Sequence, residues 1–132
     1  MSMIGIRVRT RSDMVRLIRK AKRANIEGLG HAGGAIRRAA MAGIRKARGP
    51  SVPGMPPHTR RGQLKRAIRY AVEKARDCVV IGPDYSTVGN VMLGHEFGGR
   101  FRGQRYPARP LMGPALEKVK DRLPSHWVGS VR

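Results

Sequence analysis

The first third of the chain carries two successive patterns of apolar residues. In residues 4–8, isoleucine and valine alternate with glycine or arginine, which is the period of a half-buried strand. From Ser12 or Asp13 as far as Ala47, apolar residues recur every three or four positions, and arginine and lysine occupy the other face. The pattern therefore predicts a short strand and then long helical structure, with Ser12 or Asp13 as its N-cap.

A glycine-rich segment, Gly28–Gly34, lies within this helical pattern. Glycine in a helix interior costs about 1 kcal/mol relative to alanine. We therefore expect the segment either to kink one long helix or to separate two helices. Alanine and glycine on the inner face of the following stretch would allow close packing against a sheet or another helix.

Residues 49–62 form the clearest loop, because they contain four prolines and three glycines. Proline removes a backbone donor and disfavours helix in the residue before it, so this segment should run extended over the surface. A loop of this length in a small domain is typical of a functional element or of one that becomes ordered on binding. The candidate docking residues here are Pro50, Pro53, Pro56, Pro57, Arg60 and Arg61.

The second half of the chain predicts a hairpin and a last helix. Residues 68–74 alternate, residues 74–77 suit a turn, and Cys78–Ile81 supplies the partner strand. Residues 88–97 suit a short helix or turn, and residues 98–110 form a second, basic loop. From Leu111 to Leu123 the helical spacing returns, with a proline near each end, and we expect the tail through Trp127 to be loosely ordered.

Together these elements predict a single α+β domain over residues 1–132, with surface loops 49–62 and 98–110. Aromatic residues make up only 5% of the chain, so the core must be built from aliphatic side chains, alanine and the seven methionines. That supply is small, and we expect neighbouring subunits to contribute part of the stability.

The charge of the chain points to macromolecular partners. Lysine and arginine number 28 against 8 acidic residues, a formal net charge of +20. Residues 1–61 hold 15 of these cations and only two acids, Asp13 and Glu27. Such a chain repels itself and attracts polyanions, so contact with nucleic acid or an acidic protein is expected.

Nothing in the sequence favours an enzyme. Cys78 is the only cysteine and lies in an apolar run, so it is expected to be a buried structural thiol. The four histidines lack the spacing of a helical zinc site, no carboxylates are paired at a catalytic spacing, and Gly28–Gly34 does not continue as a phosphate loop. We expect no catalytic residues, metal or cofactor. Neither a bilayer-spanning stretch nor a signal peptide is apparent, so no membrane partner is expected.

Three segments, in order, resemble the tail-completion or head–tail joining family of tailed phages. The first runs from Ala47-Arg48-Gly49-Pro50 to Thr59-Arg60-Arg61-Gly62-Gln63-Leu64-Lys65-Arg66-Ala67-Ile68, with Ala67 where the family has serine. The second is Gly94-His95-Glu96-Phe97-Gly98-Gly99. The third is Pro107-Ala108-Arg109-Pro110-Leu111-Met112-Gly113-Pro114-Ala115-Leu116, with Leu111 where phenylalanine is common.

This resemblance implies a long helix packed on a small antiparallel sheet, with a C-terminal helix. It also implies a structural virion protein of the neck or tail that forms a ring, hexameric by tail symmetry, around the DNA exit channel. The implied partners are other copies and phage proteins of the head-closure, adaptor, tail-terminator or tail-tube kinds. The implied place is the virion, after assembly in the host cytoplasm. Related neck, terminator and completion proteins share these features.

Several residues of the second and third segments are candidate interface residues. Phe97 is expected to anchor a turn at Gly98 and Gly99 in a core that is poor in aromatics. Glu96 is expected to pair with an arginine of its own or the next chain. Arg109 has a stiff backbone that suits a fixed ion pair or interface contact.

The competing interpretation is a basic DNA-binding protein, either a regulator or a packaging protein. Scarce aromatics weaken single-strand stacking, and the long proline-rich loop argues against a compact helix-turn-helix. In the neck interpretation, some of the arginines would line the DNA exit channel and hold phosphates loosely, without sequence readout, or would meet acidic faces of neighbouring proteins. The candidates for contact with phosphates or an acidic protein are Arg100, Arg102 and Arg105.

Overall fold

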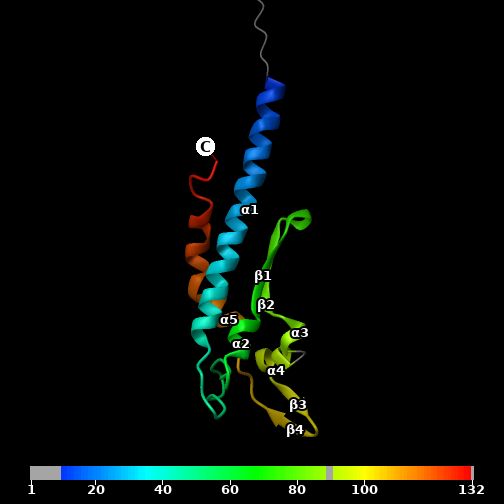
Figure 1. Cartoon of the computed structure of the whole chain (residues 1–132), viewed down its shortest axis with the longest axis vertical. Helices are drawn as coiled ribbons and strands as arrows, with labels where there is room; N and C mark the ends of the chain where they lie inside the picture. Colours follow the sequence, from blue (N-terminus) through cyan, green and yellow to red (C-terminus); the bar gives the residue numbers. More distant parts are fainter. Residues whose placement is uncertain (1–9, 89–90, 132) are drawn as a thin grey trace, which may run out of the picture.

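The longest element is a helix that runs through most of the length of the molecule and ends above the loops at its lower end (Figure 1). A computed structural model gives the fold and describes residues 10–88 and 91–131, so the strand predicted in residues 4–8 lies outside the described residues. Helix α1, Thr10–Gly43, has 34 residues. At 1.5 Å per residue its length is about 50 Å. The chain is α+β, as the sequence predicts.

The glycine-rich segment does not divide α1 into two helices. A Cβ atom at Gly28 would lie 2.5 Å from Nε1 of Trp127, and one at Gly33 would lie 2.7 Å from Cδ2 of Tyr70. These glycines therefore let two aromatic rings pack directly on the helix backbone. The contacts of the rings offset the intrinsic helix penalty of glycine.

A β-hairpin packs on one side of α1. Strand β1, Ile68–Glu73, pairs antiparallel with β2, Cys78–Pro83, through a turn that contains the 3-10 turn η1, Lys74–Arg76. Asp77 ends the turn with a φ of 48°. The predicted hairpin is confirmed, and Arg37 ties it to α1 by donating from Nε to the carbonyl oxygen of Ile68 at 2.7 Å.

The C-terminal helix packs on the opposite side of α1 from the hairpin, so α1 is the middle layer (Figure 1). Helix α5, Met112–Val119, continues into the 3-10 helix η2, Lys120–His126. The expectation of a loosely ordered tail is wrong. The indole Nε1 of Trp127 donates to Oδ1 of Asn25 at 3.1 Å, and the ring lies against Gly28.

Short elements occupy the lower end of the molecule in Figure 1. They are α2, Gln63–Ala67, then α3, Tyr85–Val88, then α4, Val91–Phe97, and a second hairpin of β3, Gly99–Phe101, and β4, Gln104–Tyr106. The predicted basic loop therefore contains a small two-stranded sheet, and the described strands form two sheets of two strands each.

The core is aliphatic, as the composition predicts. Ile44, Ile68 and Leu111 are the largest fully buried side chains, and they come from the end of α1, the start of β1 and the start of α5. Ala40, Leu64 and Ala115 are also buried in this cluster. The core therefore lies where the loops converge, and α1 extends far beyond it. Among the described helices, none has the length and apolar character that crossing a bilayer requires.

Candidate assembly surfaces

The proline-rich loop 49–62 is fastened at its base. The backbone N–H of Ala47 donates to the carbonyl of Thr59 at 3.0 Å, and the N–H of Thr59 donates to the carbonyl of Arg45 at 2.9 Å. Ser51 and Thr59 are buried, although both lie in a segment predicted to be a surface excursion. The loop is therefore a closed structure with fixed ends.

The two predicted surface loops hold each other. The N–H of Gly54 donates to the carbonyl of Ala108 at 2.9 Å, and Nε of Arg109 donates to the carbonyl of Ser51 at 3.1 Å. The backbone N–H of Arg109 also donates to the carbonyl of His95 at 2.6 Å. Arg109 thus binds backbone carbonyls of its own chain and forms no ion pair with a described acidic residue, and its role as an interface contact stays a prediction.

Glu96 caps helix α5. Its Oε2 accepts hydrogen bonds from the N–H groups of Leu111 at 2.8 Å and Met112 at 3.1 Å, and its Oε1 accepts one from Gly113 at 2.9 Å. The first N–H groups of a helix lack partners within the helix, and a negative charge there also meets the positive end of the helix dipole. Glu96 forms no ion pair with an arginine among the described residues of its own chain, and a pair with an arginine of the next chain stays a prediction.

Phe97 is not a core anchor. Its side chain is 77% exposed, which contradicts the prediction from the sequence. Tyr106 takes the internal position, because a Cβ atom at Gly94 would lie 2.7 Å from its hydroxyl oxygen. Gly98 has a φ of 71°, so the predicted glycine turn is confirmed at this residue. The exposed phenylalanine ring is left as a candidate contact for another molecule.

The proline-rich loop also exposes apolar residues that sequence reasoning missed. Val52 is 70% exposed and Met55 is 58% exposed, beside the exposed Pro53. Pro50, Arg60 and Arg61 are exposed as well, whereas Pro56 is half-buried and Pro57 is buried. The sequence did contain a signal of this exposure, because Val52 and Met55 are large apolar residues in a segment with neither a helical nor a strand period.

Arginines on the second hairpin face one another. Arg100 and Arg105 are opposite partners in the β3–β4 register, both are exposed, and Arg102 follows at the turn with a φ of 51°. Like charges directly across an antiparallel pair destabilise it. Neither Arg100 nor Arg105 forms an ion pair with an acidic residue in the described part of the chain. An anionic partner would relieve this repulsion.

A hollow of about 460 Å³ lies between the base of the proline-rich loop and α4. Its lining includes His58, Arg60, Gln63, Thr87 and His95. Nδ1 of His95 is buried and has no hydrogen-bond partner among the described residues, and burial of the side chain, together with the nearby charge of Arg109, lowers the pKa of the imidazole. None of the described residues that line the hollow carries a carboxylate or a thiol.

Other polar groups in the described residues serve the fold. Cys78 is half-buried at the start of β2, with its sulfur 3.8 Å from a carboxylate oxygen of Glu73. Hydrogen bonds from the hydroxyl and N–H of Ser86 lower the pKa of Asp84, and Arg69 adds to this effect. No group of three histidine, cysteine or acidic side chains in residues 10–88 and 91–131 is placed to hold a metal ion.

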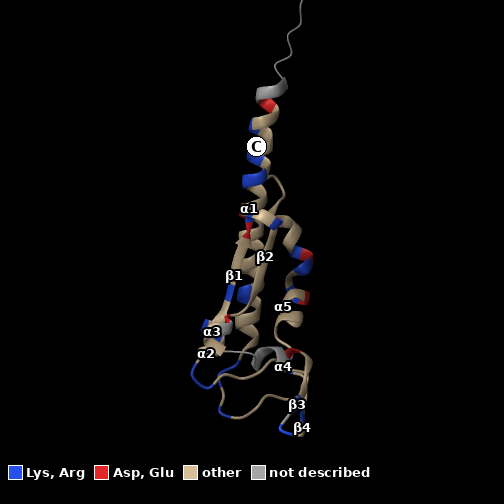
Figure 2. Ribbon diagram, turned by 90° about the vertical axis from the view of Figure 1, so that its right-hand side faces the viewer, with Lys and Arg blue, Asp and Glu red and all other residues tan. Residues whose placement is uncertain are grey.

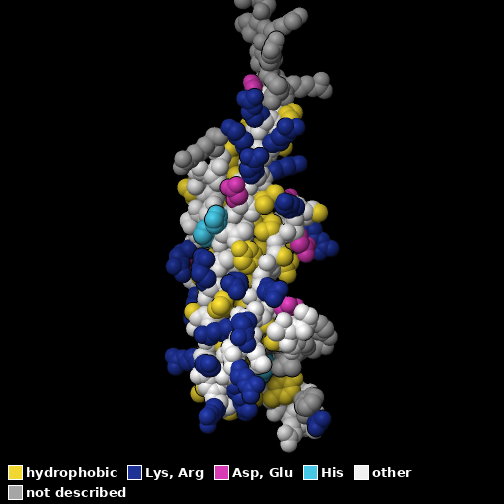
Figure 3. Space-filling model, in the orientation of Figure 1, with side chains coloured by type: hydrophobic (Ala, Val, Ile, Leu, Met, Phe, Trp, Pro, Cys, Tyr) yellow, Lys and Arg dark blue, Asp and Glu magenta, His cyan; other side chains and the backbone are white. Residues whose placement is uncertain are grey.

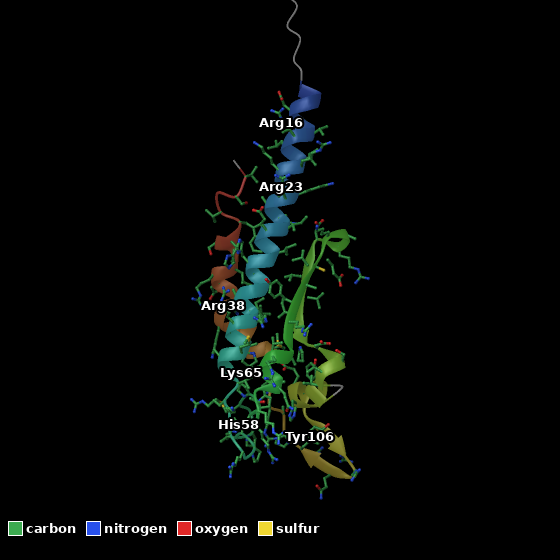
Figure 4. The ribbon with its side chains drawn as sticks, viewed as in Figure 1. Arg16, Arg23, Arg38, His58, Lys65 and Tyr106 are labelled. Carbon is green, nitrogen blue, oxygen red and sulfur yellow. The ribbon has the colours of Figure 1, made fainter. Side chains whose placement is uncertain are left out.

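Basic residues are spread along α1 and through both loops at the lower end (Figure 2). Figure 4 shows Arg16 on the part of α1 that rises above the rest of the molecule and Arg23 lower on the same helix, beside the C-terminal segment, whereas His58 and Tyr106 lie at the lower end. The chain thus offers two candidate contact regions, at opposite ends of one helix.

Comparison with known proteins adds no relative. No family model matches the chain, no curated protein matches it, and no solved structure matches it.

Proposed function

We propose that this chain is a structural component of a tailed-phage virion, a neck or tail-completion protein that assembles into a ring and performs no catalysis. One observation carries the proposal beyond the resemblance itself: the three segments that carry the resemblance pack into one unit. Leu64 and Ile68 of the first meet Leu111 of the third in the core, and Glu96 of the second caps the helix that the third begins.

This unit supports a docking role for the loop end. Because Arg109 and Ala108 hold the proline-rich loop in place, its exposed Val52 and Met55 are presented on a fixed backbone. A preformed loop loses less conformational entropy on binding than a mobile one. We propose that this end meets a neighbouring ring of the head-closure, adaptor, tail-terminator or tail-tube kind.

The hairpin supports self-assembly. The β1–β2 sheet has two strands, so each has an outer edge that pairs with no other strand in the described residues. An open strand edge is a ready site for pairing with another chain. We propose that copies of the chain meet beside this hairpin and form a ring, and that the ring surrounds DNA.

Ring formation is tested with the purified chain by size-exclusion chromatography with light scattering, followed by negative-stain electron microscopy. The expected result is one assembly of about six subunits, the number that the family resemblance implies, closed by cyclic symmetry. A monomer or dimer that binds one duplex sequence tightly at physiological salt would contradict the proposal and favour the regulator. Weak, steeply salt-dependent binding to any duplex is the result expected of a ring around DNA.

Docking is tested with the double substitution Val52→Asp and Met55→Asp in a phage that encodes the chain. Both side chains are largely exposed, so the protein should fold, whereas deletion of the loop would remove the buried Ser51. We expect infectious yield to fall by about tenfold or more if these residues are central to an interface. Val128→Asp, at a side chain that is 81% exposed, is the matched control and should leave the yield unchanged. Normal yield from the double variant would remove the docking role.

A further inference from the structure

The first part of α1 projects beyond the two layers that flank it (Figure 1). Near the limit of those layers, the side chain of Asn25 accepts a hydrogen bond from Trp127 and donates one, at 3.4 Å, to Asp77 at the hairpin turn. Beyond it, the C-terminal residues Gly129 and Ser130 reach as far as Lys20 and Arg23. Every residue in 13–23 is exposed. We call residues 13–23 the arm.

The arm has an apolar face that is in line with the buried seam of α1. Met14, Leu17 and Ile18 are each about half exposed and lie on one side of the helix at spacings of three and four. The same spacing leads through Ala21 to Ala24, which is buried beside the C-terminal segment. The apolar stripe therefore continues past the point where this chain's own C-terminal layer stops covering it.

The other side of the arm is basic. Figure 3 shows lysine and arginine side chains crowded on the arm, with apolar side chains between them. The arm carries one acidic residue, Asp13, and five basic ones: Arg16, Arg19, Lys20, Lys22 and Arg23. A helical segment of this length is marginal in water without tertiary contacts, so a partner that covers it would also stabilise it.

The combination of faces selects the chemistry of the partner. Two arms packed together would bring ten cations against two acids, so a second copy of the arm is disfavoured. A DNA duplex would satisfy the cations through its phosphates but would leave the apolar stripe in water. A protein groove with an apolar floor and an acidic rim satisfies both faces at once.

We propose that the arm is a docking helix for another protein, which receives it in a groove with an apolar floor and an acidic rim. The stripe of Met14, Leu17 and Ile18 would lie on the floor, and Arg16, Arg19 and Arg23 would meet carboxylates on the rim. This site goes beyond the proposed function and does not depend on ring formation.

The probe is a synthetic two-helix hairpin whose groove is lined with leucine and rimmed with glutamate. Two control hairpins replace the glutamate rim with glutamine or the leucine floor with serine. Binding to the full chain is followed by fluorescence anisotropy of the labelled hairpin. We expect the first hairpin to bind at least about tenfold more tightly than either control.

Two variants locate the binding on the arm. Leu17→Ser with Ile18→Ser should weaken binding of the acidic, leucine-floored hairpin by about tenfold, and Arg16→Gln with Arg19→Gln should do the same. The matched controls are Leu116→Ser, at a side chain that is 44% exposed on α5, and Lys118→Gln, also exposed, and both should bind normally. Since the arm residues are exposed, the variants should keep the unfolding temperature of the parent.

Equal binding of the serine-floored hairpin would overturn the proposal, because the arm would then be a site for polyanions in general. So would tight binding to duplex DNA, or to vesicles of phosphatidylglycerol, at an affinity matching that of the acidic hairpin. Light scattering of the arm variants separates this inference from the proposed function: a normal ring that fails to bind the hairpin supports the arm site independently.

Discussion

At the scale of single residues, hydrogen bonds from side chains to the backbone fix the structure of the loop end, where loops 49–62 and 98–110 meet. Glu96 and Arg109 are both charged, yet both side chains bond to the main chain of segments distant in sequence. Glu96 accepts hydrogen bonds from N–H groups, and Arg109 donates one to a carbonyl oxygen. Bonds between a charged group and the backbone are stronger than those between neutral groups. These two side chains therefore fasten α4, the start of α5 and the proline-rich loop together.

The stability of this fastening is measurable at Glu96. We expect Glu96→Ala to lower the free energy of unfolding by about 2 kcal/mol, because up to three N–H groups of α5 lose their acceptor. Urea denaturation monitored by circular dichroism measures the change. The control is Glu117→Ala, whose side chain is 69% exposed and pairs with Lys120, and its effect should stay within about 0.5 kcal/mol. Equal effects of the two substitutions would refute the capping role.

His95 gives stability a dependence on pH. Its pKa in the folded chain lies below the ordinary value of 6.5, because burial and Arg109 disfavour the charged imidazole. As pH falls below 6.5, the unfolded chain binds a proton at this position before the folded chain does. The free energy of unfolding should therefore decrease with falling pH in this window.

Urea titrations at a series of pH values test this prediction with His95→Gln. The variant should lose part of the decrease that the parent shows below pH 6.5, because glutamine takes up no proton. Identical slopes for the parent and His95→Gln would rule out the effect.

At the scale of elements, residues that contradict a local pattern mark where elements meet. Gly28 and Gly33 disfavour helix by intrinsic propensity, but α1 continues through both because aromatic rings pack on them. Spacing along the sequence predicted the helices and the β1–β2 hairpin, since both have regular periods. It could not predict which face of α1 would receive Tyr70 and Trp127, because those contacts join residues far apart in the chain.

The glycines of α1 allow a matched pair of substitutions. A Cβ atom at Gly30 would meet nothing within 4 Å, whereas one at Gly33 would lie 2.7 Å from the Tyr70 ring. Gly30→Ala should stabilise the chain by up to about 1 kcal/mol through helix propensity. Gly33→Ala should lower stability by about 1–3 kcal/mol, because the ring must move. Thermal unfolding of both variants gives the comparison, and a stabilised Gly33→Ala would mean that the ring does not pack there.

The candidate site was predicted less completely than the elements. Sequence patterns placed the loops and their basic residues but assigned Phe97 to the interior and Glu96 to an ion pair. A single phenylalanine gives no period from which to judge burial, and Tyr106, in β4, packs against Gly94 instead. A carboxylate among arginines also gives no sign that helix N–H groups will reach it.

At the scale of the whole molecule, one rigid helix separates two regions of different character. The loop end has a core, fastened loops and exposed apolar residues such as Val52, whereas the arm has exposed faces and no core of its own. Substitutions at one end should therefore leave the other end intact, because the sites are several turns of helix apart and share no partners. Combining the loop and arm substitutions in one chain tests this independence, because their effects on the free energy of binding to the acidic, leucine-floored hairpin should then add.

Trp127 gives the protein a built-in optical reporter. It is the sole tryptophan of the chain, and its indole rests on Gly28 and bonds to Asn25, just where the arm emerges. Its emission spectrum should shift to longer wavelength when the C-terminal segment detaches from α1 and water reaches the ring. Fluorescence can therefore follow detachment of this segment, while circular dichroism follows α1, without any label on the chain.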